Sequence, residues 1–317
     1  MSDPAAHPLG YLAGAAGPTA WPTQTLARGF TGISIAVTLI ILALVVLAIV
    51  RGRRAVREDG DGVARSGSGL SWILWGVGLS LPVLMAMAIW SFAVTRAVAQ
   101  PPARTGLTIE VTAKRWWWDM RYLADSPAGV FTTANEMVIP QGVPVTIRLT
   151  SGDVIHDFWV PKLGPKMDVI PGKWNATWLQ ADVPGTYWGA CAEFCGMEHA
   201  KMRFRVRVLT PADYQRWRTG ELEPAVAGAG AGHALFLMRC ASCHAVRGGE
   251  AGGIFGPDLT HMASRTTIGA GLLPNTADGR DRWLADTQGV KPGAEMPTIP
   301  MTVPERHALV AYLGSLR

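Results

Sequence analysis

Side chains that bind soft metal ions gather in one short stretch of the sequence, CAEFCGMEHAKM. It holds Cys191, Cys195, His199 and Met202, and a further histidine, His156, lies upstream in the β-rich segment SGDVIHDFWVP. Two thiolates, two imidazoles and one thioether form a donor set that selects copper over magnesium or calcium. Two cysteines four residues apart can lie on one loop with both sulfurs facing inward. They could therefore bridge two metal ions rather than hold one.

Two simpler interpretations of these cysteines explain less of the pattern. A disulfide between Cys191 and Cys195 suits an oxidising compartment, but it leaves His199 and Met202 without a role. A single blue-copper site requires only one cysteine. We therefore favour copper bound by both cysteines.

A second pair of cysteines indicates a different cofactor. Cys240, Cys243 and His244 form the sequence C-A-S-C-H, which is the attachment signature of c-type haem. The two thiols bond covalently to the haem, and the adjacent histidine is the proximal iron ligand. A zinc site would need a second pair of ligands, and no further cysteine remains in the sequence.

Two uncharged apolar runs precede these motifs, at about residues 30–50 and 70–94. Each is long enough to cross a membrane, and their length and lack of charge argue against two buried core helices. The five arginines between them predict a cytoplasmic loop and two external termini. Residues 1–104 hold eight Lys/Arg against four Asp/Glu, so most of the net charge of +5 lies here. No basic patch therefore argues for nucleic acid.

The remaining chain changes character twice. Short β-rich runs punctuated by Gly and Pro predict an antiparallel sandwich or barrel, the small-residue segment AVAGAGAG predicts a flexible linker, and helical stretches follow. We expect an N-terminal extracytoplasmic segment, a transmembrane hairpin, a copper domain, a linker and a cytochrome domain at residues 1–29, 30–98, 99–222, 223–232 and 233–317.

The copper motif carries a specific resemblance. Residues 106–210 resemble the CuA domain of cytochrome c oxidase subunit II, and residues 22–98 resemble its two-helix membrane hairpin. The family pattern C-x-E-x-C-x3-H-x2-M matches without a gap, and the segment KMDVIPG at 166–172 also matches. The resemblance implies an all-β, cupredoxin-like Greek-key sandwich.

The same resemblance implies a ligand set. Cys191 and Cys195 would bridge two copper ions, and the shell would be completed by His156, His199, Met202 and the backbone carbonyl of Glu193. It also implies that the Glu193 carboxylate binds magnesium at the border with the catalytic subunit, because carboxylates suit that ion.

The aromatic run KRWWWDMRY lies early in the copper domain. Neighbouring side chains alternate along a strand, so at least one of its three tryptophans is expected at the surface or an interface. The family has a related run, usually QWYW, through which electrons enter. Trp116 aligns with the entry tryptophan, whereas Arg115 and Trp117 replace Gln and Tyr. Packing in the core or at the membrane interface explains Trp116 equally well.

Residues 233–317 resemble the small class I c-type cytochromes, which implies an all-α domain. In that class a Met-Pro loop before the terminal helix supplies the second axial ligand. Met296 in KPGAEMP fits this position, and Met301 is the second candidate. Other downstream methionines are expected to fill the core.

Together these features predict electron transfer from haem c to CuA in subunit II of a terminal oxidase. The resemblance implies a catalytic subunit I with haem and CuB, a subunit III, and cytochrome c or a bc complex as donor. It also implies oxygen reduction with proton pumping in a bacterial-type inner membrane, with both termini periplasmic. The alternatives are a subunit of a nitric oxide reductase and a free-standing membrane-anchored carrier. Two membrane helices argue against the free carrier.

Overall fold

The computed structural model describes residues 14–59, 69–99, 101, 105–225 and 228–317. For residues 54–59 it describes the backbone only. The chain divides into two compact units, which are described separately. One unit comprises Trp21–Ala99, and the other comprises Met1–Ala20 together with Gln100–Arg317.

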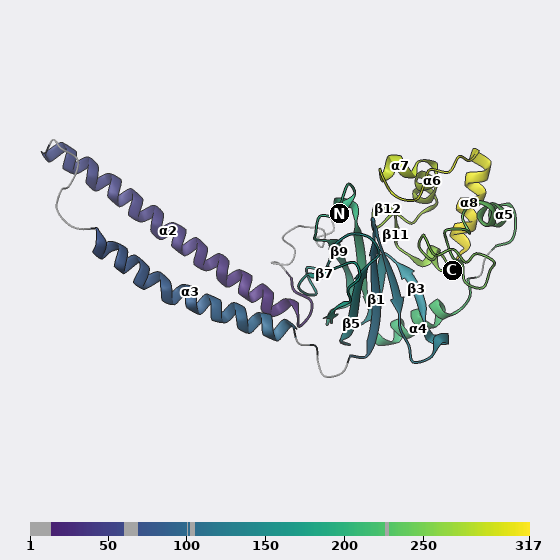
Figure 1. The fold of residues 1–317 in the computed structure, drawn as a ribbon, viewed down its shortest axis with the longest axis horizontal. Helices are drawn as coiled ribbons and strands as arrows, with labels where there is room; N and C mark the ends of the chain where they lie inside the picture. Colours follow the sequence, from purple (N-terminus) through teal and green to yellow (C-terminus); the bar gives the residue numbers. More distant parts are fainter. Residues whose placement is uncertain (1–13, 60–68, 100, 102–104, 226–227) are drawn as a thin grey trace. The chain divides into compact units, whose positions relative to one another are not determined.

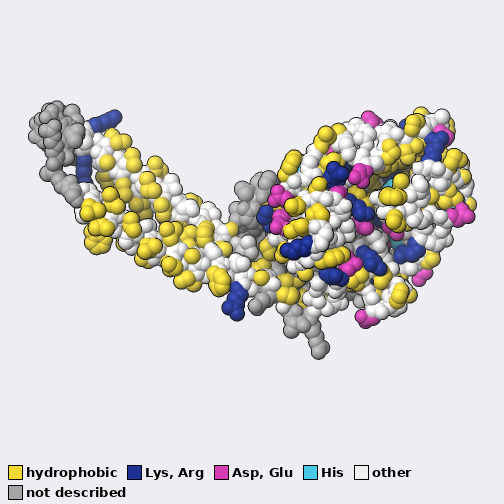
Figure 2. All heavy atoms as spheres, in the orientation of Figure 1, with side chains coloured by type: hydrophobic (Ala, Val, Ile, Leu, Met, Phe, Trp, Pro, Cys, Tyr) yellow, Lys and Arg dark blue, Asp and Glu magenta, His cyan; other side chains and the backbone are white. Residues whose placement is uncertain are grey.

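Two long helices, α2 (Ala20–Asp59) and α3 (Leu70–Ala99), make up the smaller unit (Figure 1). Their candidate membrane spans have mean hydropathies of 3.2 and 2.0, and apolar side chains cover their surface (Figure 2). The predicted hairpin of apolar helices is confirmed, although α2 begins ten residues before the predicted apolar run. A Cβ at Gly29 would lie 2.3 Å from the ring of Trp90, so glycine allows α2 and α3 to approach closely.

The β-sandwich has two sheets of five strands (Figure 1). The first, in the order β3-β2-β1-β5-β8, contains β1 (Leu107–Lys114), β2 (Trp117–Tyr122), β3 (Phe131–Ala134), β5 (Val145–Ser151) and β8 (Asn175–Leu179). The second, in the order β4-β10-β9-β6-β7, contains β4 (Glu136–Pro140), β6 (His156–Trp159), β7 (Met167–Val169), β9 (Gly185–Cys191) and β10 (Arg203–Leu209). In each sheet one pair of strands is parallel, β1 with β5 and β4 with β10, and the other pairs are antiparallel.

Alternating apolar residues form the core between these sheets. Burial along β1 and β5 alternates with the two-residue period of a strand, which turns Val and Ile inward. Trp118, Phe158 and Phe204 are almost fully buried, with ring centroids 4.7 to 5.7 Å apart. The cupredoxin-like sandwich predicted from the sequence is confirmed. The predicted copper ligands His156, at the start of β6, and Cys191, at the end of β9, therefore rest on a rigid scaffold.

Helix α4 (Pro211–Leu222) closes the copper domain and was not predicted. The Thr210 side chain accepts a hydrogen bond from the Asp213 amide at its N-terminus, which is a standard cap. Trp217 packs edge-on against Tyr122 and Phe131 at centroid distances of 5.4 and 5.5 Å. The helix thus extends the core of the sandwich at its edge.

The cytochrome domain is helical, as predicted. It contains α5 (Ala231–Arg239), α6 (Ala277–Ala285), α7 (Thr287–Val290) and α8 (Val303–Ser315), with a small hairpin of β11 (Thr267–Ile268) and β12 (Leu273–Pro274). Helix α5 begins inside the predicted linker, of which residues 226–227 lie outside the described residues. A Cβ at Gly232 would lie 2.2 Å from the Ala308 carbonyl oxygen, so glycine permits α5 to cross α8 closely.

Candidate metal and haem sites

The two sulfurs at the centre of the predicted copper site lie side by side. Cys191 ends β9, Cys195 lies in the following loop, and their Sγ atoms are 3.7 Å apart. Both side chains are buried and both thiols are free. A disulfide would require about 2.05 Å between the sulfurs. The disulfide interpretation therefore does not describe this site.

Each sulfur has further donor atoms of its own. The Nδ1 atom of His156 and the carbonyl oxygen of Glu193 lie 3.8 and 3.1 Å from Cys191 Sγ. The Nδ1 atom of His199 and the Sδ atom of Met202 lie 3.6 and 3.9 Å from Cys195 Sγ. Nitrogen and sulfur donors bound to one ion at about 2.0–2.3 Å lie roughly 3.5–4 Å apart, so these spacings fit metal ligation.

The donor set as a whole fits two copper ions. His156, Cys191 and Cys195 alone bring three ligand atoms within 4.8 Å of one another, and all three residues are buried. Soft donors on both sides of two adjacent sulfurs leave room for two ions to share the thiolates. The six predicted ligands thus converge here, whereas the carboxylate of Glu193 is exposed and turns away to accept the Phe194 amide.

Asp153 orients one of these ligands and was not predicted. Its Oδ1 atom lies 2.7 Å from His156 Nε2, which leaves Nδ1 to face the sulfur of Cys191. Burial lowers the pKa of His156, but hydrogen bonds to Asp153 and Cys191 outweigh it and raise the pKa on balance. A carboxylate behind a ligating histidine fixes its ring and tautomer. The sequence signal that could have predicted this contact is an aspartate three residues before the histidine.

Hydrogen bonding between the sulfurs separates their acidities. It lowers the pKa of Cys191 and, together with burial, raises the pKa of Cys195. Cys191 is therefore the sulfur of the pair that loses its proton more readily. Since the thiolate is the metal-binding form, the pair is prepared for a cation.

Trp116 lies directly behind the copper loop, residues 192–202, which joins β9 to β10. It is buried, and its Nε1 atom donates a hydrogen bond of 3.0 Å to the carbonyl oxygen of Cys195. Trp118 is fully buried, whereas Trp117 is only partly so, as the alternation along β2 predicted. Trp116 thus belongs to the core of the copper domain, and it also borders the cavity described next.

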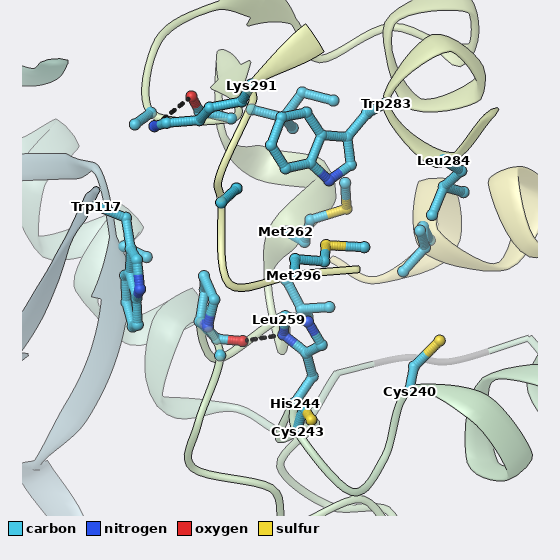
Figure 3. A pocket seen from close by; sticks show the side chains of 18 of the residues that line it. Trp117, Cys240, Cys243, His244, Leu259, Met262, Trp283, Leu284, Lys291 and Met296 are labelled. Carbon is cyan, nitrogen blue, oxygen red and sulfur yellow. Dashed lines mark hydrogen bonds between the residues drawn. The ribbon is translucent and has the colours of Figure 1, made fainter. Parts of the chain in front are cut away.

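The haem attachment motif opens into a cavity of about 360 Å³ (Figure 3). Its walls are mainly apolar, and they include Cys240, Cys243, His244, Leu259, Met262, Trp283, Leu284, Met296 and Leu309. Burial raises the pKa of Cys240 to about 11, while Cys243 is exposed. An apolar cavity beside two thiols and a histidine suits a covalently attached haem.

His244 is held in the orientation that an iron ligand needs. Its Nδ1 atom lies 2.8 Å from the carbonyl oxygen of Pro257, which leaves Nε2 free to face the cavity. Burial lowers the pKa of His244 and keeps the imidazole neutral. A Cβ at Gly256 would lie 2.5 Å from the ring, so glycine is needed behind it.

Two methionines reach the cavity. Met296 and Met262 line it together with His244, and Figure 3 shows their side chains extending toward the same space. Met301 does not line the cavity but packs against the domain's apolar core. The structure thus brings Met296 near His244 and leaves the second predicted candidate, Met301, aside.

Two half-buried arginines on the cavity wall were also missed. Arg265 and Arg280 line the cavity, and the Nε atom of each is buried with no hydrogen-bond partner among the described residues. Buried polar groups normally have partners, so these two atoms indicate a ligand that accepts hydrogen bonds. The carboxylates of a haem supply such acceptors. No local pattern marks either arginine, because their positions depend on folding of the whole domain.

Comparison with known families matches both domains. The family described as cytochrome c oxidase subunit II, periplasmic domain, matches residues 121–209. The cytochrome c family matches residues 229–317.

Individual relatives match over longer stretches. Cytochrome c oxidase subunit 2 of Alkalihalophilus pseudofirmus is 34% identical over 292 residues, which cover 89% of this chain and 83% of the relative. The protein of the same name from Bacillus sp. strain PS3 is 31% identical over 268 residues, covering 77% of this chain and 74% of the relative. The solved periplasmic domain of subunit II of cytochrome oxidase from Bradyrhizobium japonicum is 33% identical and covers 38% of this chain and 96% of that one, with a TM-score of 0.36.

Proposed function

This chain belongs to the cytochrome c oxidase subunit II family, and we propose that it passes electrons from a haem c in its C-terminal domain to a dinuclear copper centre in its β-sandwich. From there the electrons continue to a separate haem–copper catalytic subunit, which reduces oxygen to water with proton pumping. Cytochrome c or a bc complex donates electrons to the chain, and a subunit III joins the assembly.

The observation that carries this proposal is the position of Trp116 between the two sites. Its side chain borders the cavity beside the haem attachment motif, and its indole donates to the Cys195 carbonyl in the copper loop. A single side chain thus touches both sites, which supports its role as the point of electron entry to the copper centre.

The residues of the chain hold and shield the two cofactors. Cys240 and Cys243 would attach the haem, and His244 and Met296 would supply its axial ligands. Cys191 and Cys195 would bridge the coppers, and the shell would be completed by His156, His199, Met202 and the Glu193 carbonyl. When bound, both groups supply one-electron redox chemistry. Ligands held by a rigid β-sandwich change little in geometry between redox states, which favours rapid transfer.

Exposed apolar side chains around the copper loop support contact with a catalytic subunit. Phe194 and Met197 flank Cys195 and are 76% and 74% exposed. Large exposed apolar side chains beside a functional loop commonly mark a protein interface. The exposed carboxylate of Glu193 lies at the same loop, where it would bind a magnesium ion at the border with the partner.

The N-terminal segment supports a two-pass topology with both termini outside. The Ala16 amide donates to the Lys162 carbonyl at 2.9 Å, and the Asp182 amide donates to the Ala16 carbonyl at 2.9 Å. The segment before α2 is therefore on the same side of the membrane as the copper domain. Together with the arginines after the first span, this supports our proposal that both termini lie in the periplasm of an inner membrane.

The pigment and metal content of the purified complex tests the proposal. We expect two coppers and one covalent haem c per chain, accompanied by haem and CuB of the catalytic subunit. Cys195→Ser should remove the copper signal of this chain and leave the haem c spectrum unchanged. Non-haem iron in place of CuB would instead indicate a nitric oxide reductase.

A further inference from the structure

A buried lysine of the cytochrome domain reaches into the copper domain. Lys291 is only 3% exposed, and its Nζ atom donates to the carbonyl oxygens of Trp116 at 2.6 Å and Lys201 at 3.1 Å. A longer contact of 3.4 Å joins it to the carbonyl oxygen of Gly269 in its own domain. Burying an ammonium group costs free energy unless the group is hydrogen-bonded. These carbonyls therefore stabilise Lys291 in one defined position.

The contact is reciprocal. Lys201, in the copper loop between two ligands, donates from its Nζ atom to the Val290 carbonyl of the cytochrome domain at 3.4 Å. Each lysine thus donates hydrogen bonds to a backbone carbonyl of the other domain. Beside them, a Cβ at Gly293 would lie 3.4 Å from the sulfur of Met197 and 3.6 Å from the ring of Trp116. The backbone before Met296 therefore lies directly against the copper loop.

A second anchor has the opposite charge and comes from the opposite domain. Glu136 of β4 is buried, and its Oε2 atom accepts hydrogen bonds from the Thr266 amide at 2.9 Å and the Thr266 hydroxyl at 2.5 Å. Arg207 holds the other oxygen of this carboxylate at 2.9 Å. Arg205, stacked on Trp188 at 4.3 Å, donates to the same hydroxyl at 3.1 Å. Arg207 thus holds the carboxylate within its own sheet, in the position from which it contacts the cytochrome domain.

We propose that Lys291 and Glu136 are positioning residues that lock the cytochrome domain onto the copper domain and keep the haem cavity facing Trp116. This inference rests on the proposed relay between the two sites. The domain is then a docked donor rather than one that must find its target within the reach of a linker.

The hydrogen bonds of the two anchors explain why they stabilise the docked position of the cytochrome domain. Undocking would leave the Trp116 and Lys201 carbonyls and the Glu136 carboxylate without these protein donors until water replaced them. A charged group and its hydrogen-bond partners give a directional contact that apolar surface alone does not. The lock also selects one orientation, because Lys291 lies five residues before Met296 on the same loop.

The test uses the intact chain in its purified complex and compares Lys291→Met with Arg282→Met. Both changes remove one positive charge from the cytochrome domain, but Arg282 lies on the exposed surface of α6. Hydrogen exchange of peptides covering residues 199–203 and 264–272 reports docking directly. We expect exchange about tenfold faster or more in Lys291→Met and unchanged in Arg282→Met.

Electron transfer provides the second readout. In the wild type, transfer from haem c to copper should not depend on solvent viscosity, because no domain movement is required. In Lys291→Met it should become slower and depend on viscosity, while both midpoint potentials and both absorption spectra stay unchanged.

Thr266→Val keeps the inference testable if Lys291→Met fails to fold. Thr266 is exposed, and valine matches its shape while removing the hydroxyl shared by Glu136 and Arg205. It should accelerate exchange at the same peptides by a smaller factor. Unchanged exchange in both variants would overturn the lock. A wild type that shows no transfer from haem c to copper would instead contradict the proposed relay, while exchange would still report on docking.

Discussion

At the scale of single residues, the proposed copper ligands include one, His156, that a neighbouring carboxylate holds in place. Asp153 accepts hydrogen bonds from the amides of Arg115 and Val154 and contacts the far nitrogen of His156. Asp153→Asn keeps the size of the side chain but removes its charge. We expect copper affinity to fall about 10–100-fold, which is the usual effect of losing such a partner.

Competition with a copper chelator, followed through the absorbance of the copper centre, measures this loss. Asp168→Asn is the matched control. Asp168 is an exposed aspartate of β7, in the sheet that also contains His156. Equal chelator sensitivity of the two variants would show that Asp153 does not support the site.

The axial haem ligand gives a second prediction at this scale. Met296 lines the haem cavity and Met301 does not. Met296→Ala should therefore abolish the weak near-infrared band of a His/Met haem and lower the haem potential, because methionine ligation raises it. Met301→Ala should leave the band intact. Loss of the band only in Met262→Ala would transfer the role to Met262, which also lines the cavity.

The sequence could predict these candidate ligands because metal and haem attachment require particular residue types at fixed spacings. The sequence did not predict the residues whose contacts with these sites form only in the folded protein. Asp153 lies close in sequence to its partner, but Arg265, Arg280 and Lys291 reach the haem cavity only after the domain has folded. A half-buried arginine that joins a cavity wall only in the folded domain has no local signature in the sequence.

At the scale of elements, α4 contains a buried carboxyl group. Glu221 is 7% exposed, and burial raises its pKa to about 7, although Arg265 and Arg247 oppose the shift. The ordinary value is 4.5, so between these values the folded protein holds a proton that the unfolded chain releases. Stability from this group is therefore present at low pH and is lost as pH rises through about 7.

Glu221→Gln removes this dependence. We expect the melting temperature of the cytochrome and copper domains to exceed that of the wild type by a few degrees at pH 8, with little difference near pH 5. Glu223→Gln, at an exposed position just beyond α4, should have no such effect. A constant difference between Glu221→Gln and the wild type across this range would argue against the buried carboxyl as its cause.

Elements with a strong periodic or apolar pattern were predicted best. The two membrane helices follow from uncharged runs, and the sandwich follows from short strands between turn residues. Helix α4 was missed because its apolar residues are few, although Thr210 before Pro211 is a typical start signal. Helix α5 begins earlier than expected, since the small residues at 231–232 are helical rather than part of the linker.

At the scale of the whole molecule, the sequence predicted a copper domain and a cytochrome domain joined by a flexible linker. The structure adds specific contacts between them. Lys291 meets Trp116 across 175 positions of the chain, and Glu136 meets Thr266 across 130. Residues so far apart in the sequence share no local pattern, so the sequence alone could not predict that they meet.

The central claim is that haem c is the relay to the copper centre. The most direct test is rapid mixing of reduced donor with two forms of the oxidised complex, one with the intact chain and one truncated after Leu222. Both forms should show the copper spectrum. In the intact form haem c should be reduced first, with copper following as haem c is reoxidised. Without the cytochrome domain, copper reduction should be at least about tenfold slower, because the donor must then arrive by diffusion. Equally fast copper reduction in both forms would contradict the relay.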